Sequence, residues 1–125
     1  MNTCIIGIGS NIHAEENITR SLQILGKDVH ILQVSEMVKT KPIGITNQAE
    51  FTNGAVKIKT GWTQEQLNNY LKEVEDRMGR DRSEKKFGPR CIDLDIMIWN
   101  DKIVDQDFFT RDFLRNSAAE LGFKK

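Results

Sequence analysis

Two carboxylates and a nearby cation stand out in residues 87–97, with the sequence FGPRCIDLDIM. Side chains of a β-strand alternate between its faces, so Asp93 and Asp95 are predicted to share one face, with Cα atoms about 7 Å apart. Two carboxylates at this spacing repel each other unless a cation lies between them, and hard oxygen ligands suit Mg²⁺. Arg90 is placed for a phosphate rather than for the metal. The segment therefore predicts a site for metal and phosphate.

The same alternation assigns the other side chains of this strand to two faces. Cys91 and Met97 are expected on the carboxylate face, and the core face is predicted to carry Ile92, Leu94, Ile96 and Ile98. Such an apolar strand is expected to be central in its sheet, where unpaired carboxylates are costly. The alternative is a solvated strand face that binds nothing.

A basic run precedes the strand. Residues 80–90 contain only two acids but five cations, which are Arg80, Arg82, Lys85, Lys86 and Arg90. Cations that lead into two carboxylates suit a polyphosphate with its metal ions. An exposed, solvated loop is the alternative, above all for Lys85 and Lys86.

A second candidate site is the predicted loop-to-strand junction FTNGA at residues 51–55. An aromatic ring beside a carboxamide, here Phe51 and Asn53, is a common way to hold a flat heterocycle, since the ring stacks and the amide recognises donors and acceptors. From spacing alone, a core phenylalanine with a turn asparagine explains the pair better.

Composition narrows the class of protein. A chain of 125 residues is expected to form a single domain over residues 1–125. With 18 basic and 18 acidic side chains, it has no net charge that would indicate a nucleic-acid or membrane-surface partner. No stretch approaches the ~20 apolar residues of a membrane span, and no secretory signal is evident. Cys4 and Cys91 lack a paired spacing and suggest free thiols. We expect a cytoplasmic monomer.

Hydrophobic periodicity predicts the elements that position these residues. The predicted strands cover residues 3–8, 29–40, 53–59 and 91–99, the last turning at Asn100-Asp101 into a hairpin with 102–104. The predicted helices cover residues 14–25, ended by Gly26, then a helix from the N-cap Thr63 to Gly79, and 114–121. The order β-α-β-β-α-β predicts an α+β, ferredoxin-like core with an antiparallel sheet and helices packed on one face. That fold hosts many functions, so function must come from the site.

Four segments in order resemble one enzyme family. They are Ile8-Gly9-Ser10-Asn11, then Thr40-x-Pro42-x-Gly44 with Gln48-x-x-Phe51-x-Asn53, then Glu75-x-x-x-Gly79-Arg80-x-Arg82, and Phe87-Gly88-Pro89-Arg90-x-Ile92-Asp93-Leu94-Asp95-Ile96. Together, over roughly residues 3–104, they resemble the 6-hydroxymethyl-7,8-dihydropterin pyrophosphokinases of folate biosynthesis. The block with both aspartates is the most specific of the four.

This resemblance implies an activity and a set of charged site residues. The family transfers the β,γ-pyrophosphoryl group of ATP to the hydroxymethyl oxygen of the pterin and releases AMP. By resemblance, Asp93 and Asp95 hold two Mg²⁺ ions, and Glu75 faces the nucleotide. Phosphate charge would be neutralised by Arg80, Arg82 and Arg90. Since such chemistry depends on positioning and charge stabilisation, no nucleophilic side chain is expected.

The resemblance also implies a pterin site. Asn53 would bind the pterin edge, with Thr40 and Ile43 lining the pocket and Phe51 beside the ring. Phe87 replaces the tryptophan usual in its loop. Arg111 and Phe113 resemble the later part of a family loop that normally contains a histidine.

The chain departs from the family pattern after Val104. The segment before Arg111 is short, no histidine lies beyond residue 30, and the chain ends at Lys125 without the usual C-terminal extension. His13 and His30 lie in the wrong half and are expected on the surface or in a strand. A diverged relative that binds a pterin or nucleotide without catalysis is therefore an alternative. A nucleic-acid module of the same fold is a weaker one, since VKIK at residues 56–59 has no aromatic for base stacking.

Overall fold

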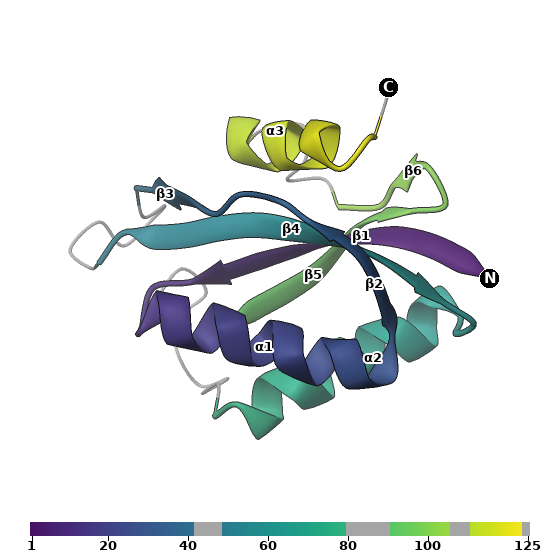
Figure 1. Ribbon diagram of the computed structural model, residues 1–125, viewed down its shortest axis with the longest axis horizontal. Helices are drawn as coiled ribbons and strands as arrows, with labels where there is room; N and C mark the ends of the chain where they lie inside the picture. Colours follow the sequence, from purple (N-terminus) through teal and green to yellow (C-terminus); the bar gives the residue numbers. More distant parts are fainter. Residues whose placement is uncertain (42–48, 80–90, 106–110, 124–125) are drawn as a thin grey trace.

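The computed structural model describes residues 1–41, 49–79, 91–105 and 111–123, which form an antiparallel sheet flanked by helices (Figure 1). The strands are β1 (Asn2–Ser10), β2 (His30–Val34), β3 (Val38–Thr40), β4 (Phe51–Thr60), β5 (Asp93–Trp99) and β6 (Lys102–Ile103). The helices are α1 (Ala14–Asp28), α2 (Gln64–Arg77) and α3 (Asp112–Glu120). The strand order is β2-β4-β1-β5-β6, with β3 also paired to β4. The predicted α+β class is confirmed.

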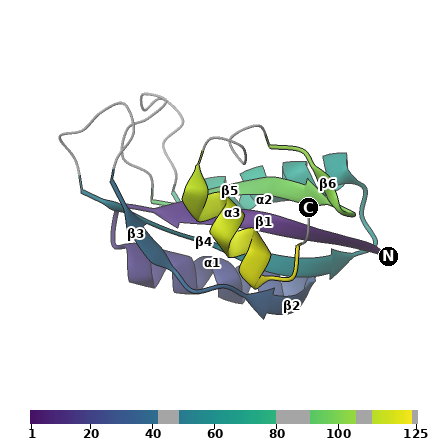
Figure 2. The ribbon, with the colours of Figure 1, turned by 90° about the horizontal axis from the view of Figure 1, so that it is seen from above.

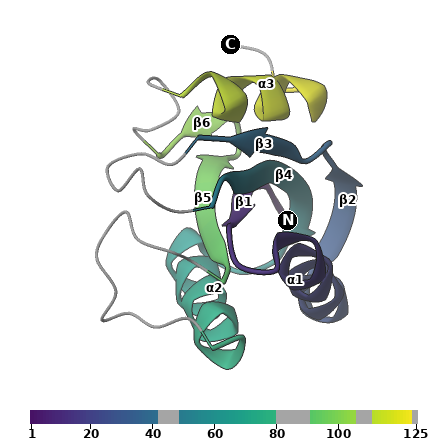
Figure 3. The same cartoon turned by 90° about the vertical axis from the view of Figure 1, so that its left-hand side faces the viewer.

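The sheet separates two layers of helix. Helices α1 and α2 cover one face, as predicted for the βαββαβ core, and α3 lies on the opposite face (Figures 1 and 3). Seen from above, α3 crosses the sheet over β4 (Figure 2). Within the described ranges, no helix is long and apolar enough to cross a membrane.

The larger core lies between the sheet and the helices α1 and α2. The helices bury Ile18 and Leu25 from α1 and Leu67, Leu71 and Val74 from α2. The strands contribute alternate side chains to the same core, namely Cys4, Ile6, Ile8, Val56, Ile58, Leu94 and Ile96. Apolar side chains recur about every 3.6 residues in the helices and every second residue in the strands, so they share the faces that meet in this core.

Helix α2 has the termini predicted from the sequence. The Thr63 hydroxyl accepts a hydrogen bond from the Gln66 backbone N–H at 3.1 Å, and the Gln66 side chain accepts one from the Thr63 N–H at 2.9 Å. This reciprocal capping box satisfies donors that the first turn leaves free. Gly79 follows the helix with φ of 88°, a conformation that glycine adopts without a Cβ clash.

The predicted hairpin between β5 and β6 is also confirmed. Asn100 and Asp101 have φ values of 47° and 69°, as a two-residue turn with both central residues in the left-handed region requires. The Asn100 side chain accepts a hydrogen bond from the Thr3 N–H at 2.9 Å and donates one to Asn2 Oδ1 at 2.8 Å. These bonds tie the turn to the start of β1.

Two predicted boundaries are wrong. Helix α1 continues through Gly26 to Asp28, because Val29 is buried and its N–H still reaches the Leu25 carbonyl at 2.9 Å. The predicted strand over residues 29–40 is two strands. Ser35 interrupts it, since its hydroxyl accepts the Ala55 N–H at 2.8 Å while its own N–H bonds to the Ala55 carbonyl. A side-chain acceptor there replaces a backbone partner of the ladder.

The prediction for the faces of β5 is partly wrong. Ile5 pairs with Ile98 but Ile6 pairs with Ile96, so the register shifts by one residue at Met97. Such a bulge reverses the alternation beyond it. Ile98 therefore packs with Met97 on the α3 side, and not with the core on the α1/α2 side.

Two further expectations around β5 are corrected. Cys91 precedes the strand, which begins at Asp93, and packs against the core on the α1/α2 side instead of sharing the carboxylate face. The strand is not central. Strand β1 occupies the middle of the sheet, and β6 pairs with β5 only at Ile98 and Trp99. Both cysteines are free, and Cys4 is buried.

Candidate active site

The two aspartates of β5 lie opposite two glycines of β1. Asp93 pairs with Gly9 and Asp95 pairs with Gly7. Both aspartates line the same pocket on the α3 side of the sheet, as predicted from their spacing. Because the glycines have no Cβ, the side chains of Met97 and Asn53 can lie over Gly7 and Gly9 respectively.

Asn53 lies on the far side of Gly9. It pairs with Gly9 from β4, so Asp93, Gly9 and Asn53 form a row across three strands that are about 4.8 Å apart. A Cβ atom at Gly9 would lie 2.6 Å from Asn53 Oδ1, so the glycine creates the space that the carboxamide occupies. The Asn53 amide also donates a hydrogen bond to Thr40 Oγ1 at 2.6 Å.

A small pocket, here called the sheet pocket, opens above this row. It has a volume of about 80 Å³. Five residues predicted for the site line it, namely Asn53, Asp93, Asp95, Arg111 and Phe113. The others are Gly7, Ile8, Gly9, Met97, Asp105 and Leu114. Residues from β1, β4, β5 and α3 thus meet at one place.

A larger pocket, here called the helix pocket, borders the same carboxylates. It has a volume of about 630 Å³ and is lined by Gln64, Glu65, Asn68, Asp95, Ile96, Val104 and Asp105. Asp95 and Asp105 line both pockets. The arrangement offers two compartments that meet at a pair of acids.

The electrostatics of this meeting point disfavour a second negative charge. The pKa of Asp95 is raised from 3.8 to about 7 by loss of hydration, then by the negative charges of Asp93, Glu75 and Asp105 and a hydrogen bond with Asp93. The Asp95 side chain still contacts solvent, and its position where the two pockets meet explains the partial loss of water. A cation bound here would favour the ionised form.

The donor set fits Mg²⁺ shared with a phosphate ligand. Among the described residues, no group of three or more His, Cys, Asp or Glu side chains could hold a metal ion by itself. Mg²⁺ is commonly bound by one or two carboxylates together with substrate phosphates. The mutually repelling carboxylates of Asp93 and Asp95 meet that description.

Glu75 lies behind the strand and is buried, with 2% of its surface exposed. Its carboxylate accepts a hydrogen bond from the Leu94 N–H at 2.8 Å. It is absent from the described residues that line the two pockets. The nucleotide contact expected of Glu75 therefore stays a prediction.

The remaining predicted residues are distributed as follows. Thr40 pairs with Phe51 in the β3–β4 ladder, and Phe51 is half-buried and absent from the described pocket linings. Outside the described residues lie Ile43, Arg80, Arg82, Phe87 and Arg90. His13 precedes α1 and His30 begins β2, both exposed, as predicted.

Sequence reasoning missed several residues of the two pockets. Gly7 and Gly9 had a signal, because they alternate with the core residues Ile6 and Ile8 and so leave room for other side chains on one face of β1. Asp105 had none. It reaches the site because the chain folds back after the hairpin, where the Asp105 N–H contacts the Met97 carbonyl at 3.4 Å.

Comparisons with known proteins show which family the sequence resembles. Residues 5–122 match the model of the family "7,8-dihydro-6-hydroxymethylpterin-pyrophosphokinase (HPPK)". The chain is 35% identical over 109 residues to the 2-amino-4-hydroxy-6-hydroxymethyldihydropteridine pyrophosphokinase of Bacillus subtilis, covering 85% of this chain and 65% of that protein. It is 32% identical over 105 residues to the Aquifex aeolicus protein of that name, covering 83% and 65%.

A fused plant protein matches as well. The chain is 33% identical over 97 residues to the "Folate synthesis bifunctional protein" of Arabidopsis thaliana, covering 76% of this chain and 20% of that protein. The chain thus spans about two thirds of the length of the two bacterial relatives.

Proposed function

The chain belongs to the 7,8-dihydro-6-hydroxymethylpterin-pyrophosphokinase family, and on that premise we propose that it transfers pyrophosphate from ATP to 6-hydroxymethyl-7,8-dihydropterin and releases AMP. Residues 1–125 would act as one catalytic domain in folate biosynthesis. The observation that carries the proposal is the meeting of two pockets at Asp95, beside Asp93 and opposite Asn53. Two substrates bound in adjoining compartments would have their reacting groups at the carboxylates, where positioning alone lowers the barrier.

The sheet pocket suits the pterin. The Asn53 carboxamide, which lies over Gly9 in this pocket, can bond to the edge of a heterocycle. Thr40 orients the carboxamide through the 2.6 Å hydrogen bond. Phe113 offers an aromatic wall from α3, and Arg111 adds a cation beside the carboxylates. Ile43, Phe51 and Phe87 complete the substrate-binding set that we propose from the sequence.

The helix pocket suits ATP. It is the larger space, and Asn68 and Gln64 offer amide groups to a nucleoside. We assign the neutralisation of phosphate charge to Arg80, Arg82 and Arg90, as the sequence predicts. Phosphoryl groups that reach toward Asp95 from this pocket would meet the pterin hydroxyl at the boundary.

Asp93 and Asp95 would hold two Mg²⁺ ions together with the ATP phosphates. When bound, Mg²⁺ neutralises charge on the transferred group and orients the acceptor hydroxyl. Asp95 would serve this role in its ionised state, which a bound cation would favour over the protonated form of the free protein. No side chain is assigned a covalent role.

We also propose a cytoplasmic monomer without a nucleic-acid partner. The free cysteines fit a reducing compartment, and the balance of 18 basic and 18 acidic residues gives no field for nucleic acid. Sedimentation equilibrium at several protein concentrations would test the monomer.

The decisive experiment measures AMP release by the purified chain. AMP is expected only when ATP, Mg²⁺ and 6-hydroxymethyl-7,8-dihydropterin are all present. Omission of the dihydropterin controls for simple ATP hydrolysis, and EDTA tests the metal. Calorimetric binding of the dihydropterin or ATP with no AMP release would contradict the proposal and indicate a binding protein instead.

A further inference from the structure

Among the residues that the structure describes, the outer edge of strand β5 is only partly paired at the aspartates. Its inner edge pairs with β1, but β6 pairs with it only at Ile98 and Trp99. Within the described part of the chain, no strand pairs with the outer edge at residues 93–96. A backbone N–H at such an edge needs another acceptor.

Glu75 supplies that acceptor for Leu94. The carboxylate oxygen lies 2.8 Å from the Leu94 nitrogen, although the two residues are 19 positions apart in the chain. Glu75 is held in turn by its helix, whose neighbouring Leu71 and Val74 are fully buried. The hydrogen bond therefore connects a rigid helix to one peptide group of β5.

That peptide group lies between the two aspartates. Leu94 follows Asp93 and precedes Asp95 in the strand, so its orientation determines where both carboxylates point. The Leu94 side chain is buried against the α1/α2 side, which leaves the aspartates on the side of the sheet pocket. A change in the position of this backbone would move both carboxylates together.

We propose that Glu75 is a positioning residue: its carboxylate accepts the Leu94 N–H and thereby aims Asp93 and Asp95 at the two pockets. This role differs from a contact with the nucleotide. The positioning role of Glu75 deepens the proposed function. Only its kinetic test rests on that function. Residues that orient metal-binding groups typically change metal affinity or activity by about 10- to 100-fold when replaced.

Two substitutions separate the role of the Glu75 side chain as a hydrogen-bond acceptor from the role of its negative charge. Glu75→Gln keeps a side-chain oxygen that can accept the Leu94 N–H but removes the charge. Glu75→Met keeps a similar volume but removes the acceptor. We expect Glu75→Met to lower kcat and to raise the Mg²⁺ concentration for half-maximal activity by about 10- to 100-fold each, with little change in KM for the dihydropterin. Glu75→Gln should keep kcat close to wild type, and the loss of its negative charge near Asp95 should not raise the Mg²⁺ requirement.

Matched controls come from the same helix. Glu73 is exposed and pairs only loosely with Arg77, at 3.3 Å. Glu73→Gln and Glu73→Met should change neither kcat nor the Mg²⁺ requirement. Thermal unfolding of all four variants shows which of them fold.

A measurement without substrates tests the same contact. Hydrogen exchange at the Leu94 amide, followed by NMR, should be slow in wild type and Glu75→Gln but faster in Glu75→Met. Mg²⁺ titration should shift the Asp93 and Asp95 signals at higher concentrations in Glu75→Met than in wild type. Should Glu75→Met not fold, an amide-to-ester replacement at Leu94 removes the donor while keeping every side chain, and should give the same losses.

Two results would overturn the inference. Equal losses in Glu75→Gln and Glu75→Met would mean that the charge of Glu75 acts directly on a ligand. Unchanged Leu94 exchange and unchanged Mg²⁺ response in Glu75→Met would mean that the hydrogen bond does not position the aspartates. Absence of AMP release by the wild-type chain would contradict the proposed function, and the exchange and titration measurements would still decide the role of Glu75.

Discussion

The same strands form both faces of the sheet, but the two faces have different roles. Of the residues that the structure describes, fifteen buried ones form the core on the α1/α2 side, whereas seven form the core on the α3 side. Along β1, the first side receives Cys4, Ile6 and Ile8. The second receives Ile5 and then the two glycines of the sheet pocket. Along β1, the apolar core on the α1/α2 side continues as far as Ile8, whereas the core on the α3 side stops at Ile5, where the sheet pocket begins.

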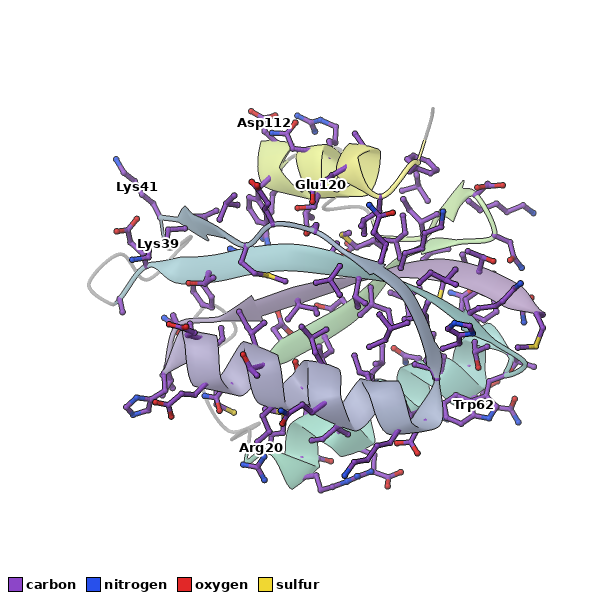
Figure 4. All side chains as sticks on the ribbon, in the orientation of Figure 1. Arg20, Lys39, Lys41, Trp62, Asp112 and Glu120 are labelled. Carbon is purple, nitrogen blue, oxygen red and sulfur yellow. The ribbon has the colours of Figure 1, made fainter. Side chains whose placement is uncertain are left out.

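The helices differ in the same way. Helices α1 and α2 rest on continuous apolar stripes, but α3 gains part of its attachment from polar contacts at its C-terminal end. Glu120, which faces the sheet in Figure 4, accepts the Glu36 N–H at 2.8 Å, and its carbonyl accepts a hydrogen bond from the Gln33 side chain at 3.3 Å. Asp112 at the other end of α3 points outward (Figure 4). The comparison indicates that the α1/α2 side provides stability and the α3 side sacrifices core volume for a site.

The largest effect is expected from a substitution that removes a carboxylate from the site and leaves the apolar cores unchanged. Asp95→Asn should lower kcat for AMP release by about 1,000-fold, because several kcal/mol of charge stabilisation depend on the metal and each 1.36 kcal/mol is tenfold. A coupled assay of AMP measures it. Asp101→Asn, the same change in the exposed hairpin turn, serves as the control and should be neutral. Retention of most activity in Asp95→Asn would end the proposed metal role.

A pair of core truncations compares the faces directly. Leu71 and Leu121 are 0% and 1% exposed and belong to the α1/α2 and α3 cores respectively. Leu71→Ala should lower the free energy of unfolding by about 3 kcal/mol and Leu121→Ala by about 2 kcal/mol, since the smaller core beside a pocket can relax around the cavity. Urea denaturation measures both.

The same pair should differ in kinetics. Leu121→Ala loosens α3, which carries Phe113 and Leu114 into the sheet pocket, so KM for the dihydropterin should rise. Leu71→Ala should leave KM unchanged at temperatures where the variant is folded. Equal losses of stability and equal KM values would refute the division of labour between the two faces.

A smaller effect is expected from adding a Cβ atom at Gly9 of β1. Gly9→Ala would place a Cβ atom 2.6 Å from Asn53 Oδ1 and force the carboxamide to move. We expect KM for the dihydropterin to rise by about tenfold, in line with the 1–3 kcal/mol typical of overpacking. Gly61→Ala is the matched control, since its nearest neighbour would be Met1 Sδ at 3.6 Å. Unchanged kinetics in Gly9→Ala would remove Asn53 from the pterin site.

The smallest expected effect concerns the pH dependence of stability. The pKa of Asp95 is about 7 in the folded chain, against an ordinary value of 3.8 for an aspartate side chain, so the folded state binds more protons between these values. Stability contributed by protonated Asp95 is present below about pH 4 and is lost as the pH rises through 7. Asp95→Asn should therefore be more stable than wild type at pH 8 by about 1 kcal/mol, a reduced figure because solvent reaches the side chain.

Urea denaturation without Mg²⁺ at pH 5 and pH 8 measures this difference. The gain of Asp95→Asn over wild type should grow with pH, and saturating Mg²⁺ should diminish it by stabilising ionised Asp95. Asp101→Asn should show no such trend. If the stability gained by Asp95→Asn fell as the pH rose, folding would lower the pKa of Asp95 instead of raising it, and the prediction would be wrong.

Much of the fold followed from local signals in the sequence. The capping box at Thr63, the glycine after α2 and the Asn100-Asp101 turn each depend on a few consecutive residues, and the structure has all three. The site was predicted less completely. Asp93 and Asp95 were identified by type and spacing, and Asn53 by the family resemblance, but their juxtaposition depends on how β1 pairs with β4 and β5. Spacing within one segment carries no information on that register.

The sequence by itself determined the order of the βαββαβ core, the shared face of the two aspartates and the family to which the chain belongs, since alternation, caps and motifs are properties of short segments. Tertiary structure alone decided the bulge at Met97 that turned Ile98 to the other face, the space over Gly9 that Asn53 fills, and the hydrogen bond from Leu94 to Glu75. Each of these joins residues far apart in the chain, and their energies are set by packing and register between elements. The chemistry of the site follows from its residue types, whereas its geometry belongs to the folded sheet.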